Sequence, residues 1–251
     1  MNFAGIGCQG ECMKNISELA LFEEVKQNRP VRIAAFGSSN TERLQPGMHW
    51  FDILELGLKP FFKGCLGGCI NVGVGGNTTR QMLERFERDV AFYKPHLVIV
   101  TAGGNDSNPP RNISREEYRK NLFTIHEKIS SWGGEVIFQT YYACKLQCLS
   151  DEMAENMIFN MQQVREVAES TSSCLVDHFA RWERLRLQEY GLYTLLMKDN
   201  MHLNCAGNSV LGLDLLRCFG AELPEAFRPD FALGLFAQKV LDDLETKSGD
   251  L

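Results

Sequence analysis

Hydrophobic residues along the chain form short continuous runs, which alternate with longer segments where apolar positions recur every three or four residues. The short runs, bounded by glycine or polar residues, are typical of buried strands. The expected strands cover residues 31–36, 69–72, 97–101, 135–140 and 174–176. The longer segments are typical of amphipathic helices, and Ser114 with Glu117 forms a capping box where one of them begins. The expected helices cover residues 50–62, 79–91, 115–131, 151–169, 206–219 and 224–244.

This alternation of strands and helices predicts the fold class. Strands separated by helices of a dozen or more residues are joined by right-handed crossovers, which produce a parallel sheet covered on both faces. We therefore expect a three-layer α/β/α sandwich around a central, mostly parallel five-stranded sheet. An active site in such a fold lies where loops leave the carboxyl ends of the strands. The corresponding loops cover residues 37–41, 73–79, 103–108 and 140–144.

The length and composition limit the class of protein. The alternation continues without a break through 251 residues, which favours a single domain over residues 1–251 with an N-terminal extension (1–30) and a C-terminal helical tail (222–251). A content of 44% hydrophobic and 23% charged residues is typical of a soluble globular protein. We leave open whether the protein forms a homo-oligomer.

The charge pattern argues against two kinds of partner. The net charge is −6 and the sequence has no cluster of Lys and Arg, so a nucleic-acid partner is not expected. No segment approaches the apolar length of a membrane span, and the first residues lack the pattern of a secretory signal. We therefore expect no membrane partner and a cytoplasmic location, and a leader removed ahead of residue 1 stays an open alternative.

Nine cysteines raise the question of a metal site or a disulfide. Three pairs share CxxxC spacing: Cys8/Cys12, Cys65/Cys69 and Cys144/Cys148. Structural zinc sites prefer CxxC pairs and often include histidine, so we interpret these residues as reduced thiols and expect no metal ligands.

Two short motifs at the ends of the chain point to nucleophilic catalysis. A serine hydroxyl is a weak nucleophile at neutral pH unless an imidazole lies beside it and a carboxylate orients that imidazole. Ser39 follows the first expected strand, and Asp199 stands three residues before His202 in a late loop. The alternatives are that DxxH spacing arises by chance and that the serine turn at 37–41 only caps a helix.

Two further loops carry groups that could hold a developing negative charge. The glycine-rich segment 71–79 resembles a phosphate-binding loop, but it has neither GxGxxG in register nor a GK[ST] ending, so a nucleotide ligand is disfavoured. Asn105 follows the strand at 97–101, where an asparagine can form a turn or donate to an oxyanion.

Together these segments resemble the SGNH (GDSL-like) hydrolase family, whose fold is flavodoxin-like. Four blocks match in the family's order across Gly37–His202, namely GSSNT at 37–41, NVGVGGNT at 71–78, GGND at 103–106 and DNMH at 199–202. The resemblance implies a catalytic triad of Ser39, Asp199 and His202. It also implies an oxyanion hole formed by Ser39, Gly76 and Asn105, and it requires no cofactor. One position departs from the family, because Ser38 stands where an Asp is usual.

By this resemblance the protein is a serine esterase that cleaves short-chain carboxylic esters through an acyl-enzyme intermediate. O-acetyl groups on carbohydrate are the substrate class that the resemblance favours. Three alternatives stay open: an acyltransferase, a thioesterase, and a catalytically weak ligand-binding protein of the same fold.

Several other residues are weaker candidates for contact with a substrate. Tyr141 and Tyr142 follow the fourth expected strand and could stack on a sugar or line an acyl pocket, although aromatic residues at strand ends more often serve in packing. Asn77 and Asp106 lie in the matched blocks and are included as possible substrate contacts. The remaining histidines are His49, His96, His126 and His178. We expect each to lie at the surface or to lie in the core with its hydrogen bonds satisfied.

Overall fold

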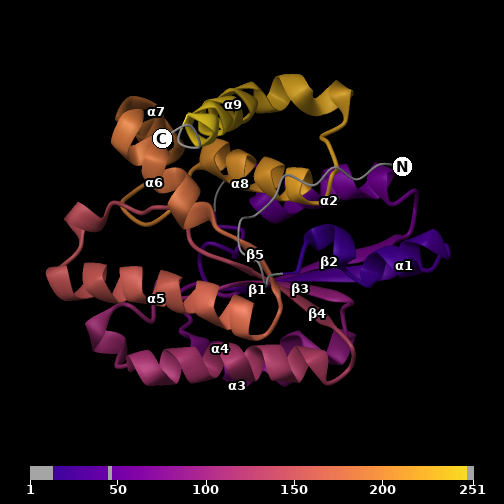
Figure 1. The fold of residues 1–251 in the computed structure, drawn as a ribbon, viewed down its shortest axis with the longest axis horizontal. Helices are drawn as coiled ribbons and strands as arrows, with labels where there is room; N and C mark the ends of the chain where they lie inside the picture. The colour runs from indigo at the N-terminus through magenta and orange to yellow at the C-terminus, as the bar shows by residue number, and fades with distance from the viewer. Residues whose placement is uncertain (1–13, 45–46, 248–251) are drawn as a thin grey trace.

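A computed structural model describes residues 14–44 and 47–247, and its centre is one parallel sheet (Figure 1). The strands lie in the order β2-β1-β3-β4-β5, and each neighbouring pair is parallel. Their bounds are β1 Val31–Gly37, β2 Leu66–Gly73, β3 Leu97–Thr101, β4 Glu135–Gln139 and β5 Cys174–Val176. The predicted fold class is confirmed. Successive strands are added on one side of β1 and then on the other, so the switch point of the topology lies between β1 and β3.

Helices cover both faces of the sheet, as continuous apolar strands require. One face carries α3 Thr79–Asp89, α4 Arg115–Ser130 and α5 Asp151–Ser170. The other face carries α1 Leu21–Lys26, α2 Trp50–Phe61, α6 His178–Gln188, α7 Tyr190–Leu196, α8 Cys205–Cys218 and α9 Ala232–Thr246. Successive side chains of a strand point to opposite faces of the sheet. Ile33 therefore belongs to the core between the sheet and α2, and Ala34 belongs to the core between the sheet and α3.

The two helices that follow the serine and histidine motifs pack closely against each other. A Cβ atom added to Gly57 of α2 would lie 2.4 Å from the Leu216 side chain of α8. A Cβ atom added to Gly212 of α8 would lie 2.7 Å from the Ile53 Cβ of α2 and 2.8 Å from the Trp50 carbonyl oxygen. The absence of side chains at both glycines therefore permits this short separation between α2 and α8.

Most expected elements agree with the structure, and the differences have local causes. The helix expected over 79–91 ends at Asp89, and a short 3-10 helix, Ala91–Tyr93, follows it. The tail expected as one helix is divided into a 3-10 helix, Glu225–Phe231, which contains Pro229, and α9. The second strand begins at Leu66, ahead of two glycines that obscure its apolar pattern.

Among the α-helices of the described residues, α1, α6 and α7 were not predicted. The Asp177 side chain, which accepts the N–H of Ala180, caps α6 directly after the three-residue strand β5. Leu187 and Leu195 are 66% and 62% exposed, so the apolar positions of α6 and α7 do not follow a single buried stripe.

Candidate active site

The serine motif lies in a tight turn at the carboxyl end of β1. The carbonyl of Ser38 accepts the N–H groups of Thr41 and Glu42, both at 2.9 Å. Ser38 and Thr41 are buried, whereas Ser39 at the tip of the turn is partly exposed. The turn therefore presents the Ser39 hydroxyl at the edge of the sheet.

The DxxH motif forms a small loop between α7 and α8. The carbonyl of His202 accepts the N–H of Lys198 at 2.8 Å, so the loop closes on itself. Oδ1 of Asp199 accepts the N–H groups of Met201 at 2.7 Å and His202 at 2.8 Å. Partial burial raises the pKa of Asp199, but these N–H donors and the His202 ring outweigh it, and the pKa lies below its usual value. The carboxylate is therefore ionised at neutral pH.

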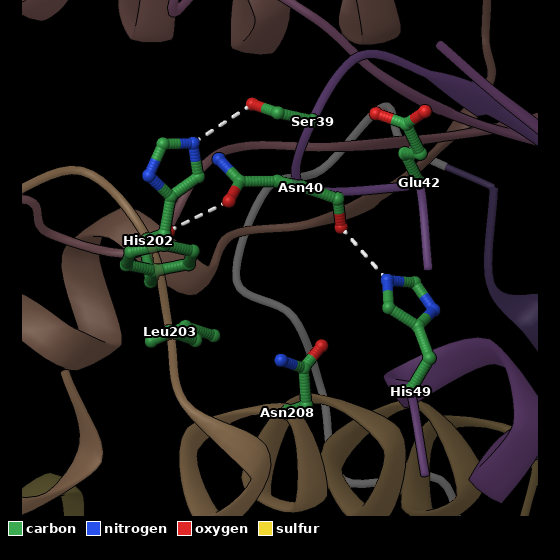
Figure 2. Close-up of a pocket in the computed structure, with 8 residues that line it drawn as sticks. Ser39, Asn40, Glu42, His49, His202, Leu203 and Asn208 are labelled. Carbon is green, nitrogen blue, oxygen red and sulfur yellow. Dashed lines mark hydrogen bonds between the residues drawn. The ribbon is translucent and has the colours of Figure 1, made fainter. Parts of the chain in front are cut away.

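The structure brings these two motifs into contact. Nδ1 of His202 lies 3.0 Å from both carboxylate oxygens of Asp199. Nε2 of His202 lies 3.0 Å from Oγ of Ser39 (Figure 2). An anionic carboxylate at Nδ1 favours the tautomer with its proton there, which leaves Nε2 to accept the serine O–H. The three groups thus have the connectivity that activates a serine nucleophile.

The residues predicted for the oxyanion hole lie on loops after neighbouring strands. Gly37 of β1 pairs with Gly73 of β2 and with Thr101 of β3, so the three loops leave the sheet at the same level. Gly76 has φ +75, a conformation that favours glycine. Nδ2 of Asn105 donates to the carbonyl of Asn77 at 3.0 Å, which joins the second and third loops.

The backbone amides of Ser39 and Gly76 belong to the predicted oxyanion hole. Within residues 14–44 and 47–247, neither the N–H of Ser39 nor that of Gly76 donates to another group of the chain. Buried or partly buried N–H groups normally find an acceptor, so these two are available to a bound oxygen atom.

Tyr141 connects the serine turn to the end of β4. Its hydroxyl lies 2.9 Å from Oγ of Ser38, and both residues are 2% exposed. Burial raises the pKa of Tyr141, so the pair is uncharged. Ser38, which stands where the resembled family usually has Asp, therefore makes a hydrogen bond between two uncharged hydroxyl groups.

Tyr142 connects the serine turn to the DxxH loop. Its hydroxyl lies 2.8 Å from Oδ1 of Asn40 and also contacts the carbonyl of Met201. Tyr142 is 1% exposed, and its ring packs against Trp182 of α6. Tyr141 and Tyr142 both contact protein groups, and a substrate role for either stays a prediction.

Asn77 and Asp106 also have protein partners. Asp106 is buried, and its Oδ1 accepts both the N–H and the hydroxyl of Thr79, at 2.9 and 2.5 Å. Burial raises the pKa of Asp106. Oδ1 of Asn77 accepts from Nε of Arg85 at 2.7 Å. A substrate contact by either residue stays a prediction.

A small pocket adjoins the serine and histidine. Its lining is Ser39, Asn40, Glu42, His49, Tyr142, His202, Leu203 and Asn208 (Figure 2). His49 is buried: its Nε2 lies 3.1 Å from the Asn40 carbonyl, and its Nδ1 accepts the N–H of Phe51. Burial lowers the pKa of His49 to about 4, so the ring is neutral at neutral pH.

The structure also corrects the expectation for His178. This residue is 1% exposed, and neither ring nitrogen has a hydrogen-bond partner among the described residues. His178 therefore lies in the core, but its ring lacks the hydrogen bonds that we expected a core histidine to make. His49 agrees with the expected core role, since it is buried and both of its ring nitrogens have hydrogen-bond partners, and it also caps α2 beside the pocket. Asp52, three residues later, completes a capping box with His49 and was the available signal.

Other expectations from the sequence concern metals, cysteines and membranes. In the described part of the chain, no group of three or more His, Cys, Asp or Glu side chains is arranged to hold a metal ion. Cys65, Cys69, Cys144 and Cys148 are thiols, while Cys8 and Cys12 lie outside the described residues. None of the described helices combines the length and apolar character of a membrane span. The cytoplasmic location and the single-domain boundaries stay predictions.

Comparison with known proteins identifies several similar sequences. Residues 35–210 match the GDSL-like Lipase/Acylhydrolase family. An acetylxylan esterase of Geobacillus stearothermophilus is 27% identical over 161 residues, which cover 61% of this chain and 72% of that protein. An uncharacterized lipoprotein of Bacillus subtilis (strain 168), YqeF, is 32% identical over 120 residues, which cover 43% of this chain and 47% of that protein.

Solved structures show the same fold. The crystal structure of Axe2, an acetylxylan esterase from Geobacillus stearothermophilus, has a TM-score of 0.67 at 24% identity and covers 79% of this chain and 98% of its own. LAE5, an alpha/beta hydrolase from the metagenome of Lake Arreo in Spain, has a TM-score of 0.66 at 24% identity and covers 76% of this chain and 96% of its own.

Proposed function

Because the chain belongs to the GDSL-like lipase/acylhydrolase family and is a carboxylic ester hydrolase, we propose that it removes acetyl and other short acyl groups from carbohydrate. In this proposal Ser39 is the nucleophile, His202 is the general base and acid, and Asp199 orients His202. The observation that carries the proposal is the 3.0 Å contact between Ser39 Oγ and His202 Nε2, with Asp199 at the opposite nitrogen.

The first half of the reaction forms an acyl-enzyme. Ser39 Oγ bonds to the ester carbonyl carbon while its proton passes to Nε2 of His202, and the Asp199 carboxylate stabilises the resulting imidazolium. The carbonyl oxygen becomes an oxyanion, which accepts from the N–H groups of Ser39 and Gly76 and from Nδ2 of Asn105. Each such donor contributes on the order of 3 kcal/mol in the transition state. His202 then protonates the alcohol oxygen as the ester bond breaks.

The second half releases the acid. A water molecule gives a proton to Nε2 of His202 and attacks the acyl carbon, and the oxyanion forms again in the same place. The bond to Ser39 Oγ breaks as His202 returns the proton to it. The sum is ester plus water to acid plus alcohol, and every atom and proton comes from the ester, water and these side chains.

Two observations support the substrate class. The Geobacillus relative is named an acetylxylan esterase, which makes O-acetylated carbohydrate the first class to consider. The pocket beside Ser39 is lined mainly by hydrogen-bonding side chains, such as Asn40, Glu42 and Asn208. Such side chains suit a hydroxyl-rich alcohol, and the small size of the pocket leaves little room for a long acyl chain.

The role of Ser39 is tested with a matched pair of serine variants. We expect Ser39→Ala to lower the kcat for p-nitrophenyl acetate and for acetylated xylo-oligosaccharides by on the order of 10⁶-fold. The wild-type protein should be labelled at Ser39 by a fluorophosphonate probe, and the variant should not be. Ser170→Ala serves as the control, because Ser170 is the last residue of α5 and its hydroxyl donates to the Glu166 carbonyl of the same helix. Retained turnover or labelling in Ser39→Ala would contradict the proposal.

The acyl preference needs a separate test. We expect kcat/KM to fall from acetate through butyrate to octanoate on a common alcohol. If octanoate were cleaved fastest, the short-acyl part of the proposal would be wrong even if Ser39 proved to be the nucleophile.

A further inference from the structure

Arg85 of α3 lies buried behind the serine turn and the glycine-rich loop. Its side chain is 8% exposed, which is unusual for a charged residue. Nη2 donates to the carbonyl of Gly37 at 2.8 Å, and Nη1 donates to the carbonyl of Val72 at 2.6 Å. Nε donates to Oδ1 of Asn77 at 2.7 Å. One guanidinium group therefore bonds to the ends of two strands and to the loop that follows the second.

Two further contacts fix the plane and the charge of this group. Nη1 lies 3.0 Å from a carboxylate oxygen of Asp89, one turn later on α3. The guanidinium carbon lies 4.9 Å from the centre of the Phe36 ring, within the range of a cation–π contact. The positive charge of Arg85 is thus balanced by Asp89, and the plane of its guanidinium group is fixed.

The contacts of Arg85 continue to all the proposed oxyanion donors. Gly37 lies two residues before Ser39, and Asn77 directly follows Gly76. The carbonyl of Asn77 accepts from Nδ2 of Asn105. A continuous series of hydrogen bonds therefore joins the serine turn, the loop of Gly76 and the side chain of Asn105.

We propose that Arg85 is a positioning residue, which sets the distance between Ser39 and the oxyanion donors Gly76 and Asn105. The proposal rests on the function proposed above. A planar guanidinium with five N–H donors can bond to separate acceptors in fixed directions, whereas the ammonium of lysine cannot reproduce that arrangement. Oxyanion donors act only when they are held where the charge develops, so a small shift of the loop affects kcat more than binding.

The first test replaces the guanidinium. We expect Arg85→Met to lower kcat for p-nitrophenyl acetate about 100-fold, the cost of a misplacement of about 1 Å, with KM changed less than about threefold. Arg85→Lys should recover only a small part of that loss. Arg88→Met is the matched control, since Arg88 lies on the same helix and also pairs with Asp89, but it is exposed. Its kcat should equal that of the wild type.

The second test shows whether Arg85 acts through the glycine-rich loop. Asn77→Ala removes one acceptor of Arg85 and should lower kcat by about tenfold. If both residues act in one series, the double variant Arg85→Met/Asn77→Ala should be no slower than Arg85→Met alone. If the double variant instead lost kcat by the product of the two single losses, Arg85 would not act through Asn77.

A third measurement separates positioning from a general loss of folding. Methylguanidinium added to Arg85→Ala should raise kcat and leave the wild type unchanged, because it supplies the missing donors. If Arg85→Met does not fold, Asn77→Ala and this recovery decide the question. If Arg85→Lys and Asn77→Ala both kept the wild-type kcat while Ser39→Ala was inactive, the positioning role of Arg85 would be wrong and the proposed function would stand. Activity in Ser39→Ala would instead overturn the proposed function.

Discussion

The two halves of the candidate site are held in place in different ways. On the nucleophile side, Ser38 and Thr41 are 2% and 0% exposed, and the turn bonds to residues from other elements. On the acid–base side, the side chains of Asp199 and His202 are 45% and 33% exposed. The nucleophile turn is thus anchored in the core by Ser38 and Thr41, while the DxxH loop lies at the surface.

The sources of order differ accordingly. The DxxH loop is organised largely by hydrogen bonds within itself, since the Asp199 carboxylate accepts two N–H groups of the loop and the His202 carbonyl accepts the N–H of Lys198. Its tertiary partners are the Tyr142 hydroxyl and the N–H of Lys145. The turn around Ser39 depends on tertiary contacts such as those of Arg85 and Tyr141. We therefore expect substitutions in the DxxH loop to change the rate alone, and substitutions behind the turn to change rate and stability together.

The largest effect should come from His202→Ala. Loss of the general base should lower kcat/KM for p-nitrophenyl acetate by on the order of 10⁶-fold. The free energy of unfolding should change by no more than about 0.5 kcal/mol, because the side chain is partly exposed. Urea unfolding and steady-state kinetics measure both, with His126→Ala of α4 as the control. A large loss of stability would remove the distinction between the two halves.

Asp199→Asn should have the next largest effect. An amide cannot hold the imidazole in the required tautomer, which costs up to about 10⁴-fold in kcat where the carboxylate is buried. Because Asp199 is 45% exposed, water screens its charge, and we expect a smaller loss than that limit. Steady-state kinetics at pH 7 measures the ratio, and a loss equal to that of His202→Ala would contradict the expectation.

On the buried side, acid should weaken the fold through His49. Burial lowers its pKa to about 4 from 6.5, so below pH 6.5 the unfolded chain binds a proton that the folded chain does not. This contribution to stability is complete above pH 6.5 and is lost as the pH falls towards 4. The loss amounts to about 2 kcal/mol between pH 6.5 and pH 5.

Urea unfolding at several pH values tests this prediction with His49→Asn, which keeps a capping side chain but does not titrate. The pH dependence of the variant should be smaller. It should not vanish, because burial also lowers the pKa of His178 to about 4. An unchanged pH dependence would show that His49 is not held neutral in the fold.

The smallest effect should come from Tyr141→Phe. Removal of one hydroxyl leaves Ser38 Oγ without its partner and should lower the free energy of unfolding by about 1–2 kcal/mol. The kcat should fall as well, because Ser38 adjoins the nucleophile. Tyr193→Phe removes a similar buried hydrogen bond, to the Ala143 carbonyl, and should lower stability without changing kcat. Equal kinetic effects in the two variants would show that Tyr141 has no particular link to the nucleophile.

The features that follow from local sequence were predicted well. The strand LVIVT and the order of strands and helices led to the parallel sheet, and the four motif blocks led to the family, which is confirmed. The contact of Ser39 with His202 agrees with the prediction, but only the serine motif follows a strand. The DxxH loop joins two helices, and the packing of α8 against α2 brings it to the serine turn. Their catalytic roles stay predictions.

The features that depend on tertiary contacts were not predicted. Arg85 was missed because a charged residue on an amphipathic helix normally faces solvent, and its acceptors come from two strand ends and a loop. The exposure of Asp199 and the inward direction of Tyr141 depend in the same way on neighbours distant in sequence. Neither hydrophobic periodicity nor motif spacing contains that information.

The separation of Ser39 and His202 in the chain has a consequence for biosynthesis. The two residues stand 163 positions apart, and the close packing of α2 against α8 brings their segments together. During translation the serine turn leaves the ribosome long before the histidine does, and a domain generally folds as a unit. The nascent chain therefore carries a serine without its base, and it acquires a complete set of reacting groups only after α8 has been made and docked.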